Sequence, residues 1–344
     1  RTLRTALNAW PQSSFEGEGD VSSRVSHYNF ASASNLLSEA LRLGGEWISD
    51  KRAASGSDIL KEYLSAASDH AKGRQERVQA QLSFATFNDR LYHELKARID
   101  SSEYAQLKRV IRDRKEEYER SLAIMRNWPA RDRTDPVQAA EYTSLKRHVN
   151  TMQKETTADA EEIKESEKNL KDYLFQAMRG FGNVLAWSED HDLEVVFRAV
   201  SIWVSHRHDK RVNDTMEEVI QKTKSFKFVP LTYQLLALLG DNESDSLSDG
   251  SHSPREGLSQ SLGKRDQEDR FQRLLQDMVL RLCSEHPYHC LPQLFALVNR
   301  DESGMGALEV FKAKAKTQRS FIAESILGSL RDKRKSGMGL AHLV

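Results

Sequence analysis

The chain has 344 residues, of which 38% are hydrophobic and 30% are charged, and its 51 Lys and Arg residues balance its 51 Asp and Glu residues. This balance gives no overall attraction to nucleic acid or to a membrane surface. Only 17 Gly and 7 Pro residues are present, and so few helix breakers among so many charges favour long helices with hydrated outer faces.

Two cysteines, Cys283 and Cys290, are too few for a disulfide framework and are typical of a reducing compartment. The longest apolar run, residues 229–239, is far shorter than the roughly 20 residues that a membrane-spanning helix needs. We therefore expect no membrane segment and a nuclear or cytosolic location. The first residue is Arg1 and not Met, so we expect the chain to be a piece of a longer protein.

Helical periodicity dominates the first 128 residues, with no strand or hairpin-turn pattern. Asp58 and Ser101 are candidate N-caps of helices, and Trp128 before Pro129 marks a helix end. Within residues 35–48, one broad apolar face is predicted to be buried, and it comprises Leu36, Leu37, Ala40, Leu41, Leu43 and Trp47.

The sequence Asp135-Pro136 predicts the start of the longest helix, because Pro is favoured at the first helical position. About 45 residues with near-heptad spacing would extend for roughly 65–70 Å. Polar residues between Thr156 and Asp159 interrupt the apolar seam, so a kink is allowed for there. Leu170, Leu174 and Phe181 are candidates for the seam of a projecting arm or of a dimer interface.

The second half alternates apolar helices with polar segments. A helix is expected through residues 193–204, and His206 and His208 beyond it are interpreted as a C-terminal cap. Residues 226–239 are apolar nearly all round, which predicts one helix buried on several sides. Residues 241–264 are rich in Ser, Asp and Gly and predict a disordered insert. Further helices are expected over residues 271–282, 286–299 and 308–330.

Ten to twelve helices in antiparallel pairs, without strands, predict an all-α protein of the α-solenoid type or an irregular helical array. No strict internal period is present, so any repeats are degenerate. The sequence holds no Gly-rich nucleotide loop and no known catalytic triplet, which indicates a chain without its own catalytic residues, cofactor or metal.

Cys283, His286, His289 and Cys290 could suggest zinc, but structural zinc ligands come in two separated halves, and here all four lie within eight residues. Packed cysteines and surface histidines are the favoured interpretation. The basic stretch of residues 312–335 is interpreted as a solvated helix face anchored by Phe321, Ile322, Ile326 and Leu330, and direct nucleic-acid contact is the less favoured alternative.

Several segments resemble the FAT region of the ATM kinases, which belong to the phosphatidylinositol-3-kinase-related kinases and are known in fungi as telomere-length-maintenance kinases. The similarity extends over residues 36–330. The segments that carry this resemblance are LGGEWI (43–48), DILKEYL (58–64), LSFATF (82–87), SSEY (101–104), SIW (201–203), KFVPLTYQL (227–235) and HPYH (286–289).

The resemblance implies a helical clamp with tetratricopeptide-like repeats over residues 1–128, an arm over 129–190, and HEAT-like repeats over 191–240 and 266–335, with the insert at 241–265. It also implies a scaffold that clamps and regulates a C-terminal kinase domain and contributes to homodimerisation. The whole protein would be a nuclear, Ser/Thr-Gln-directed kinase in double-strand-break signalling and telomere maintenance.

The resemblance further implies that ATP and Mg are bound by the kinase domain, and that a break-sensor complex is a partner of the whole protein. Ser259, which precedes Gln260 in the insert, is then a candidate autophosphorylation site. A free-standing solenoid adaptor that binds other proteins is the alternative function.

Overall fold

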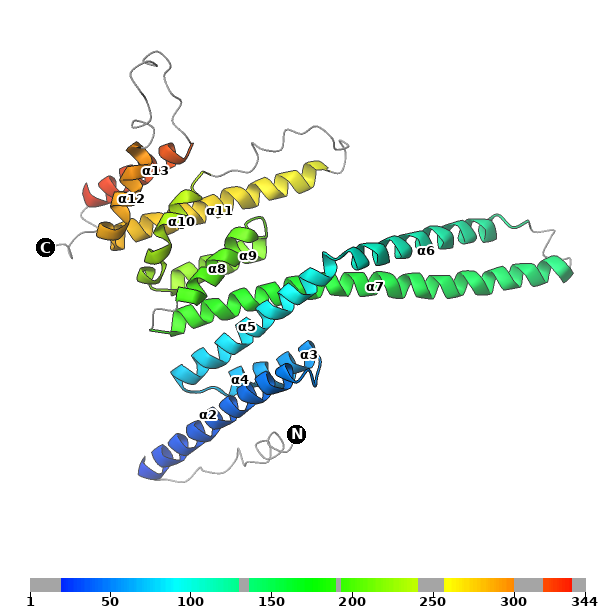
Figure 1. The fold of residues 1–344 in the computed structure, drawn as a ribbon, viewed down its shortest axis with the longest axis horizontal. Coiled ribbons are helices and arrows are strands. Elements are labelled where there is room, and N and C mark those ends of the chain that lie inside the picture. Colours follow the sequence, from blue (N-terminus) through cyan, green and yellow to red (C-terminus); the bar gives the residue numbers. More distant parts are fainter. Residues whose placement is uncertain (1–19, 130–135, 190–192, 241–256, 300–317, 336–344) are drawn as a thin grey trace, which may run out of the picture. The chain divides into compact units, whose positions relative to one another are not determined.

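The computed structural model describes residues 20–129, 136–189, 193–240, 257–299 and 318–335, and among them every regular element is a helix (Figure 1). The predicted all-α class is therefore confirmed, while its assignment to tetratricopeptide and HEAT repeats stays a prediction. Contacts divide the chain into two compact units, residues 1–84 and 85–344.

The first unit contains α2 (Asp20–Asp50), a continuous helical stretch formed by α3 (Gly56–Asp58), η1 (Ile59–Leu64) and α4 (Ser65–His70), and the first turns of α5 (Arg74–Ile99). The hydroxyl of Ser38 donates to the carbonyl of Ala67 at 2.7 Å. A Cβ atom at Gly45 would lie 3.0 Å from Tyr63 Cβ, so glycine permits the close approach of η1 to α2.

The broad apolar face predicted for α2 is only partly buried. Leu37 is 5% exposed, but Leu36 is 73% and Trp47 is 63% exposed. The buried side is selected by the small residues Ser34, Ser38 and Gly45, because they let the two helices approach closely, so the large side chains point elsewhere. The first cap also differs from the prediction: the Ser55 hydroxyl, and not Asp58, accepts the cap hydrogen bond, from the backbone N–H of Asp58.

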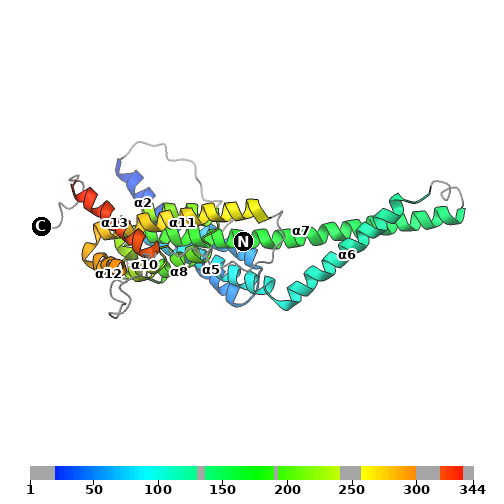
Figure 2. The same cartoon turned by 90° about the horizontal axis from the view of Figure 1, so that it is seen from above.

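The second unit begins with the rest of α5 and continues into an antiparallel hairpin of α6 (Ser102–Arg126) and α7 (Pro136–Trp187), which lie side by side in Figures 1 and 2. The Ser101 hydroxyl caps α6, as predicted. Ion pairs set the register of the hairpin, at 3.3 Å between Lys108 and Glu167 and at 2.7 Å between Arg114 and Asp159. The α7 helix passes through residues 156–159 without a break, and Arg114 pairs with Asp159 of the polar seam there.

Beyond the hairpin, the end of α7 packs against α8 (Leu193–Ser205) and α9 (Lys210–Lys222). The remaining helices pack in turn on α8, on α9 and on one another. They are η3 (Ser225–Leu231), α10 (Thr232–Ala237), α11 (Gly257–Glu285), α12 (Pro287–Asn299) and α13 (Gln318–Lys335). Trp203 and Phe271 are both fully buried at the centre, with ring centroids 4.7 Å apart.

Two predicted segments differ from the structure. Residues 226–239 form a 3₁₀ helix followed by a short α-helix and not one helix, since Pro230 lies within them and lacks a backbone N–H. The predicted disordered insert ends earlier than expected, because α11 begins at Gly257. Extending a formed helix costs much less than starting one, so the strong helix after residue 265 extends back into this polar segment. Residues 241–256 lie outside the described part of the chain.

Replacing Gly182 with alanine should lower the free energy of unfolding, because a Cβ atom there would lie 2.3 Å from Val219 Cγ2. Overpacking costs about 1–3 kcal/mol, against a helix-propensity gain of about 1 kcal/mol. Urea unfolding measures the change. Gly328 in α13 is the matched control, since nothing lies within 4 Å of its added Cβ. Equal stabilisation by Gly182→Ala and Gly328→Ala would contradict the close contact of α7 with α9.

Candidate functional site: the C-terminal helical layers

A buried lysine closes the C-terminal end of α7. The Lys227 side chain, in a residue that is 3% exposed, donates from Nζ to the carbonyl oxygens of Leu185 at 3.1 Å and Ser188 at 2.9 Å. The last carbonyl groups of a helix lack hydrogen-bond donors within the helix and carry partial negative charge. A cation at this end therefore donates the missing hydrogen bonds and offsets that charge. This contact fixes α7 to η3 through Lys227, the first residue of the KFVPLTYQL segment.

A second buried network joins α8, α9 and α11. The indole Nε1 of Trp203 donates to Asn213 Oδ1 at 2.9 Å, and Asn213 Nδ2 donates to the carbonyl of Arg207 at 2.8 Å. Arg207 Nε lies 3.3 Å from Glu268 Oε2, and both residues are buried. Buried polar groups that find their partners fix one packing arrangement of these helices.

The turn His206–His208 follows α8 and has the polar character that was predicted. His206 Nδ1 lies 3.0 Å from the carbonyl of Ile202, so this nitrogen donates and Nε2, 2.9 Å from the Tyr92 hydroxyl, accepts. Burial lowers the pKa of His206, and the charge of Lys96 acts in the same direction. Nearby, Arg198 pairs with Asp89 through two hydrogen bonds of 2.6 and 2.7 Å, so α5 and α8 meet through polar groups.

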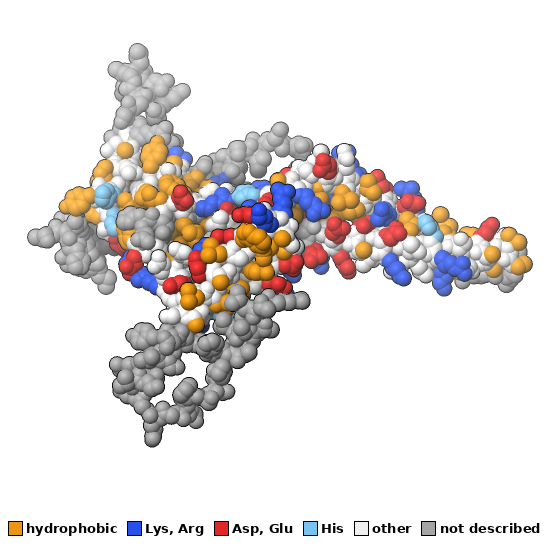
Figure 3. Space-filling view, turned by 60° about the horizontal axis from the view of Figure 1, so that its bottom comes forward, with side chains coloured by type: hydrophobic (Ala, Val, Ile, Leu, Met, Phe, Trp, Pro, Cys, Tyr) orange, Lys and Arg blue, Asp and Glu red, His pale blue; other side chains and the backbone are white. Residues whose placement is uncertain are grey.

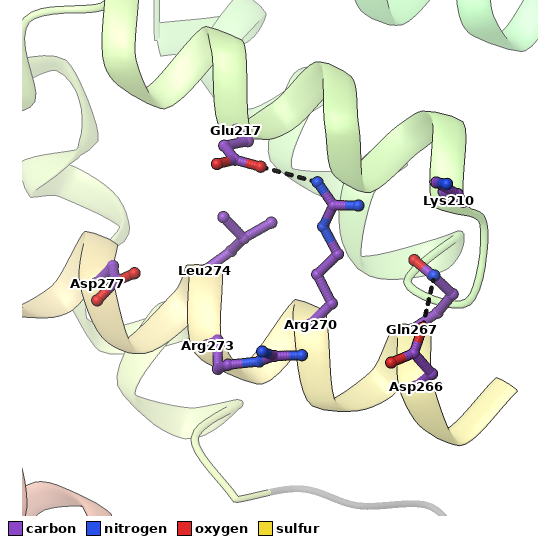
Figure 4. A pocket seen from close by; sticks show the side chains of 8 residues that line it. All are labelled: Lys210, Glu217, Asp266, Gln267, Arg270, Arg273, Leu274 and Asp277. Atoms are coloured by element: carbon purple, nitrogen blue, oxygen red, sulfur yellow. Dashed lines mark hydrogen bonds and ion pairs between the residues drawn. The ribbon is translucent and has the colours of Figure 1, made fainter. Parts of the chain in front are cut away.

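An open groove of about 480 Å³ lies between α9 and α11 (Figure 4). Arg270 crosses it and pairs with Asp214 at 2.5 Å and Glu217 at 2.8 Å, and the hydrogen bond that Arg270 donates to Glu217 raises the pKa of Arg270. The lining holds three basic residues, Lys210, Arg270 and Arg273, and three acidic residues, Glu217, Asp266 and Asp277. This balance gives the groove no preference for an anion or a cation.

The candidate zinc ligands do not converge on one point: the two cysteines are neighbours, but the two histidines lie elsewhere. Cys283 and Cys290 are free thiols in the core, and the neighbouring Cys290 thiol together with burial raises the pKa of Cys283. His286 Nε2 lies 2.8 Å from the Ser225 hydroxyl, whereas His289 is exposed. Within the described ranges, no three His, Cys, Asp or Glu side chains gather where they could hold a metal ion.

The residues predicted for an interface seam lie mostly inside the chain's own fold. Leu174 and Phe181 are each 4% exposed, and Leu170 is half-buried. In this conformation Leu174 and Phe181 offer no surface to a second chain, so substitutions there would act on the core. Ser259 belongs to α11, in a part whose side chains are not described.

The basic C-terminal stretch lies partly outside the described residues, which resume at Gln318. Arg319 donates to the carbonyl of Leu239 at 3.0 Å, and so it helps to pack α13. Of the predicted anchors, Ile326 is buried, but Phe321 is 66% exposed. Among the described residues, no helix combines the length and hydropathy that are needed to cross a lipid bilayer.

Comparison with known proteins finds relatives of this chain among the ATM and Tel1 kinases. The chain is 27% identical to the serine/threonine-protein kinase ATM of Arabidopsis thaliana over 83% of its length, and 25% identical to the serine-protein kinase ATM of Sus scrofa over 77%. It is 25% identical to the serine/threonine-protein kinase tel1 of Emericella nidulans over 73%. It spans only 7–8% of these three relatives. No protein-family model matches the chain.

Solved structures agree with this fold. The structure described as the FAT and kinase domain of CtTel1 aligns with a TM-score of 0.55 and 20% identity, over 85% of this chain and 16% of that one. The complete CtTel1 dimer with C2 symmetry aligns with the same TM-score over 85% of this chain and 9% of that one. The homologues of this helical chain are thus the ATM and Tel1 kinases. The resemblance predicted from the sequence is confirmed.

The KFVPLTYQL and HPYH segments are distinctive in the sequence, but their structural roles are not visible there. A lysine within an apolar helical run signals either an exposed position or a buried cation with a fixed partner. The partner carbonyls of Lys227 belong to Leu185 of α7 and to Ser188 just after it, 42 and 39 residues earlier, so no local pattern could identify them.

Lys227→Met should lower the free energy of unfolding by about 2–3 kcal/mol, because it leaves carbonyl groups at the end of α7 without a donor in a dry site. Lys224→Met, at an exposed position three residues earlier, is the control and should change little. Chemical unfolding followed by circular dichroism measures both. Equal stability of the two variants would show that Lys227 does not hold α7.

Acidification should destabilise the chain through His206. Since its pKa is lower in the folded than in the unfolded chain, the unfolded state binds the proton more readily. The stability that depends on neutral His206 is full above pH about 6.5 and is lost as pH falls below that value. Unfolding curves between pH 7.5 and 5 should have a smaller pH slope in His206→Gln than in the parent. An unchanged slope in His206→Gln would refute this assignment.

Proposed function

We propose that this chain is the FAT region of an ATM-type serine/threonine protein kinase and acts as a non-catalytic helical scaffold. In this role it clamps and regulates a kinase domain that follows it in the same polypeptide, and it contributes to a homodimer. The observation that carries the proposal is the length of the match, since similarity to ATM covers 83% of the chain.

The architecture is suited to such a role. The hairpin of α6 and α7 forms the arm, and the helices that pack on the C-terminal end of α7 form the base, so arm and base share the single helix α7. The C-terminal end of α7 is enclosed by α8 and α9 and capped by Lys227. A helical array of this kind contacts its neighbours over large surfaces without carrying out a chemical reaction itself. The symmetric dimer of CtTel1 supports the homodimer as part of the proposal.

The whole protein is proposed to act in the nucleus, in double-strand-break signalling and telomere maintenance, on Ser-Gln and Thr-Gln sites. ATP and Mg would bind to its kinase domain, and a break-sensor complex would recruit it. Ser259 is proposed as an autophosphorylation site. These proposals follow from the names of the relatives and from the resemblance, and a free-standing adaptor remains the alternative.

Loosening the scaffold should change kinase activity at a distance. Trp203→Ala in the full-length kinase removes a fully buried indole, which costs about 3–5 kcal/mol of local stability. We expect at least a fivefold change in the phosphorylation of a Ser-Gln peptide and a lower unfolding temperature of the kinase domain. Arg112→Ala, at an exposed position of α6, is the control. A soluble Trp203→Ala enzyme with loosened helices but unaltered kinase activity and stability would favour the adaptor.

A further inference from the structure

The turn that joins α2 to α3 carries a serine with two basic residues before it. Its sequence is Lys51-Arg52-Ala53-Ala54-Ser55, so Arg52 lies three residues and Lys51 four residues before Ser55. All five residues are exposed, and they lie outside both helices. We call residues 51–55 the basic turn.

The two cations of the basic turn are not neutralised by the chain itself. Neither Lys51 nor Arg52 forms an ion pair with any residue that the structure describes. Along the arm, at the right of Figure 3, Lys and Arg side chains instead lie among Asp and Glu side chains, and they form pairs such as that of Arg120 with Glu116 at 3.5 Å. An exposed basic pair without such partners attracts an acidic surface of another protein.

Arg52 occupies a backbone position that favours glycine. Its φ of 51° lies in the left-handed region, and no other described residue except glycine has a positive φ. The backbone N–H of Ala53 donates to the carbonyl of Ile48 at 3.1 Å and thereby ends α2. Strain of this kind is typical of functional positions, and here it places a cation in a turn that glycine would form without strain.

The serine hydroxyl lies on extended backbone. Ser55 has φ −68° and ψ 152°, and its hydroxyl donates to Asp58 Oδ2 at 2.6 Å. A protein kinase holds its substrate segment extended, with the acceptor oxygen in line with the γ-phosphoryl group of ATP. The small side chains of Ala53 and Ala54 leave room for the walls of such a groove. Only exposed hydrogen bonds, to Asp58 and Ser57, have to break before the hydroxyl can turn outward.

A second serine has the same spacing from an arginine but a different backbone. Ser101 follows Arg98 by three residues. Arg98, however, still belongs to helix α5, and the Ser101 hydroxyl donates to its carbonyl at 2.7 Å. Ser101 is also half-buried. Because helical backbone does not lie extended across a groove, the spacing alone does not make Ser101 a substrate.

We propose that Ser55 is a phosphorylation site for a protein kinase of the basic-directed class, whose acidic groove recognises Arg and Lys before the acceptor residue. Ser55 Oγ forms the new bond to the γ-phosphorus of ATP, the bond to ADP breaks, and the hydroxyl proton passes to the base of that kinase. The product carries about −1.5 to −2 charges in a turn that now presents two cations. Gly56 and not Gln follows Ser55, so the site differs from the Ser-Gln sites of the proposed function, and the inference does not rest on that function.

Phosphorylation of the full-length protein tests the site. The catalytic subunit of cyclic-AMP-dependent protein kinase is the basic-directed probe, and mass spectrometry measures the initial rate of phosphate incorporation at each serine. A reaction without the probe measures self-phosphorylation. Arg52→Gly removes the charge and suits the positive φ, so this variant keeps the turn folded. Ser101 and Ser57 are controls within the same chain.

We expect the probe to modify Ser55 at least tenfold faster than Ser101 or Ser57, and Arg52→Gly to lower the rate at Ser55 at least tenfold. Casein kinase 2, which prefers acidic residues after the acceptor, is the second probe, because Asp58 follows Ser55 by three residues. Equal rates at Ser55 and Ser101, a rate that Arg52→Gly leaves unchanged, or faster modification by the second probe would each overturn the proposal. The Trp203→Ala experiment is independent of these results, so the scaffold function is tested separately.

Discussion

The rest of the second unit depends on the contacts that enclose the C-terminal end of α7. The helix is 52 residues long, and a free helix of that length would fray and bend at its ends. Here Gly182 allows α9 to approach closely, and the Lys227 ammonium neutralises the partial negative charge of the last carbonyls. Both contacts come from residues later in the chain, so α7 is fixed only when the following helices have packed.

The two ends of α7 are held by different proportions of apolar packing and ion pairing. Toward the C-terminal end, the side chains of Leu174, Ala177, Met178 and Phe181 are buried in an apolar core. Toward the arm, Val149 and Met152 are buried, and partly exposed ion pairs such as that of Arg114 with Asp159, which contribute little stability each, add to this packing. Under the proposed function, the base is the rigid brace for a kinase, and the arm is the part whose contacts salt can weaken.

Local sequence patterns predicted the elements whose signals are local. The Ser101 cap, the start of α7 at Pro136 and the polar turn after α8 follow from short-range chemistry and are confirmed. The buried side of α2 was predicted only in part, since hydrophobicity alone cannot show that Ser38 and Gly45 make the closest contact. The start of α11 at Gly257 was also missed, because the helix that stabilises it begins beyond the polar segment. Residues 286–299 were predicted as a helix, but only packing shows which side chains of α12 stay exposed.

The most direct measurement of the central claim, that arm and base share one uninterrupted rod, is the distance between spin labels on α7. Cysteines at the exposed positions Glu141 and Arg179, in a chain whose native thiols are buried, would carry the labels. A continuous helix predicts a single narrow distribution near roughly 57 Å, from 38 residues at about 1.5 Å each. A broad distribution, or a second population at much shorter distance, would show that the helix breaks within the arm.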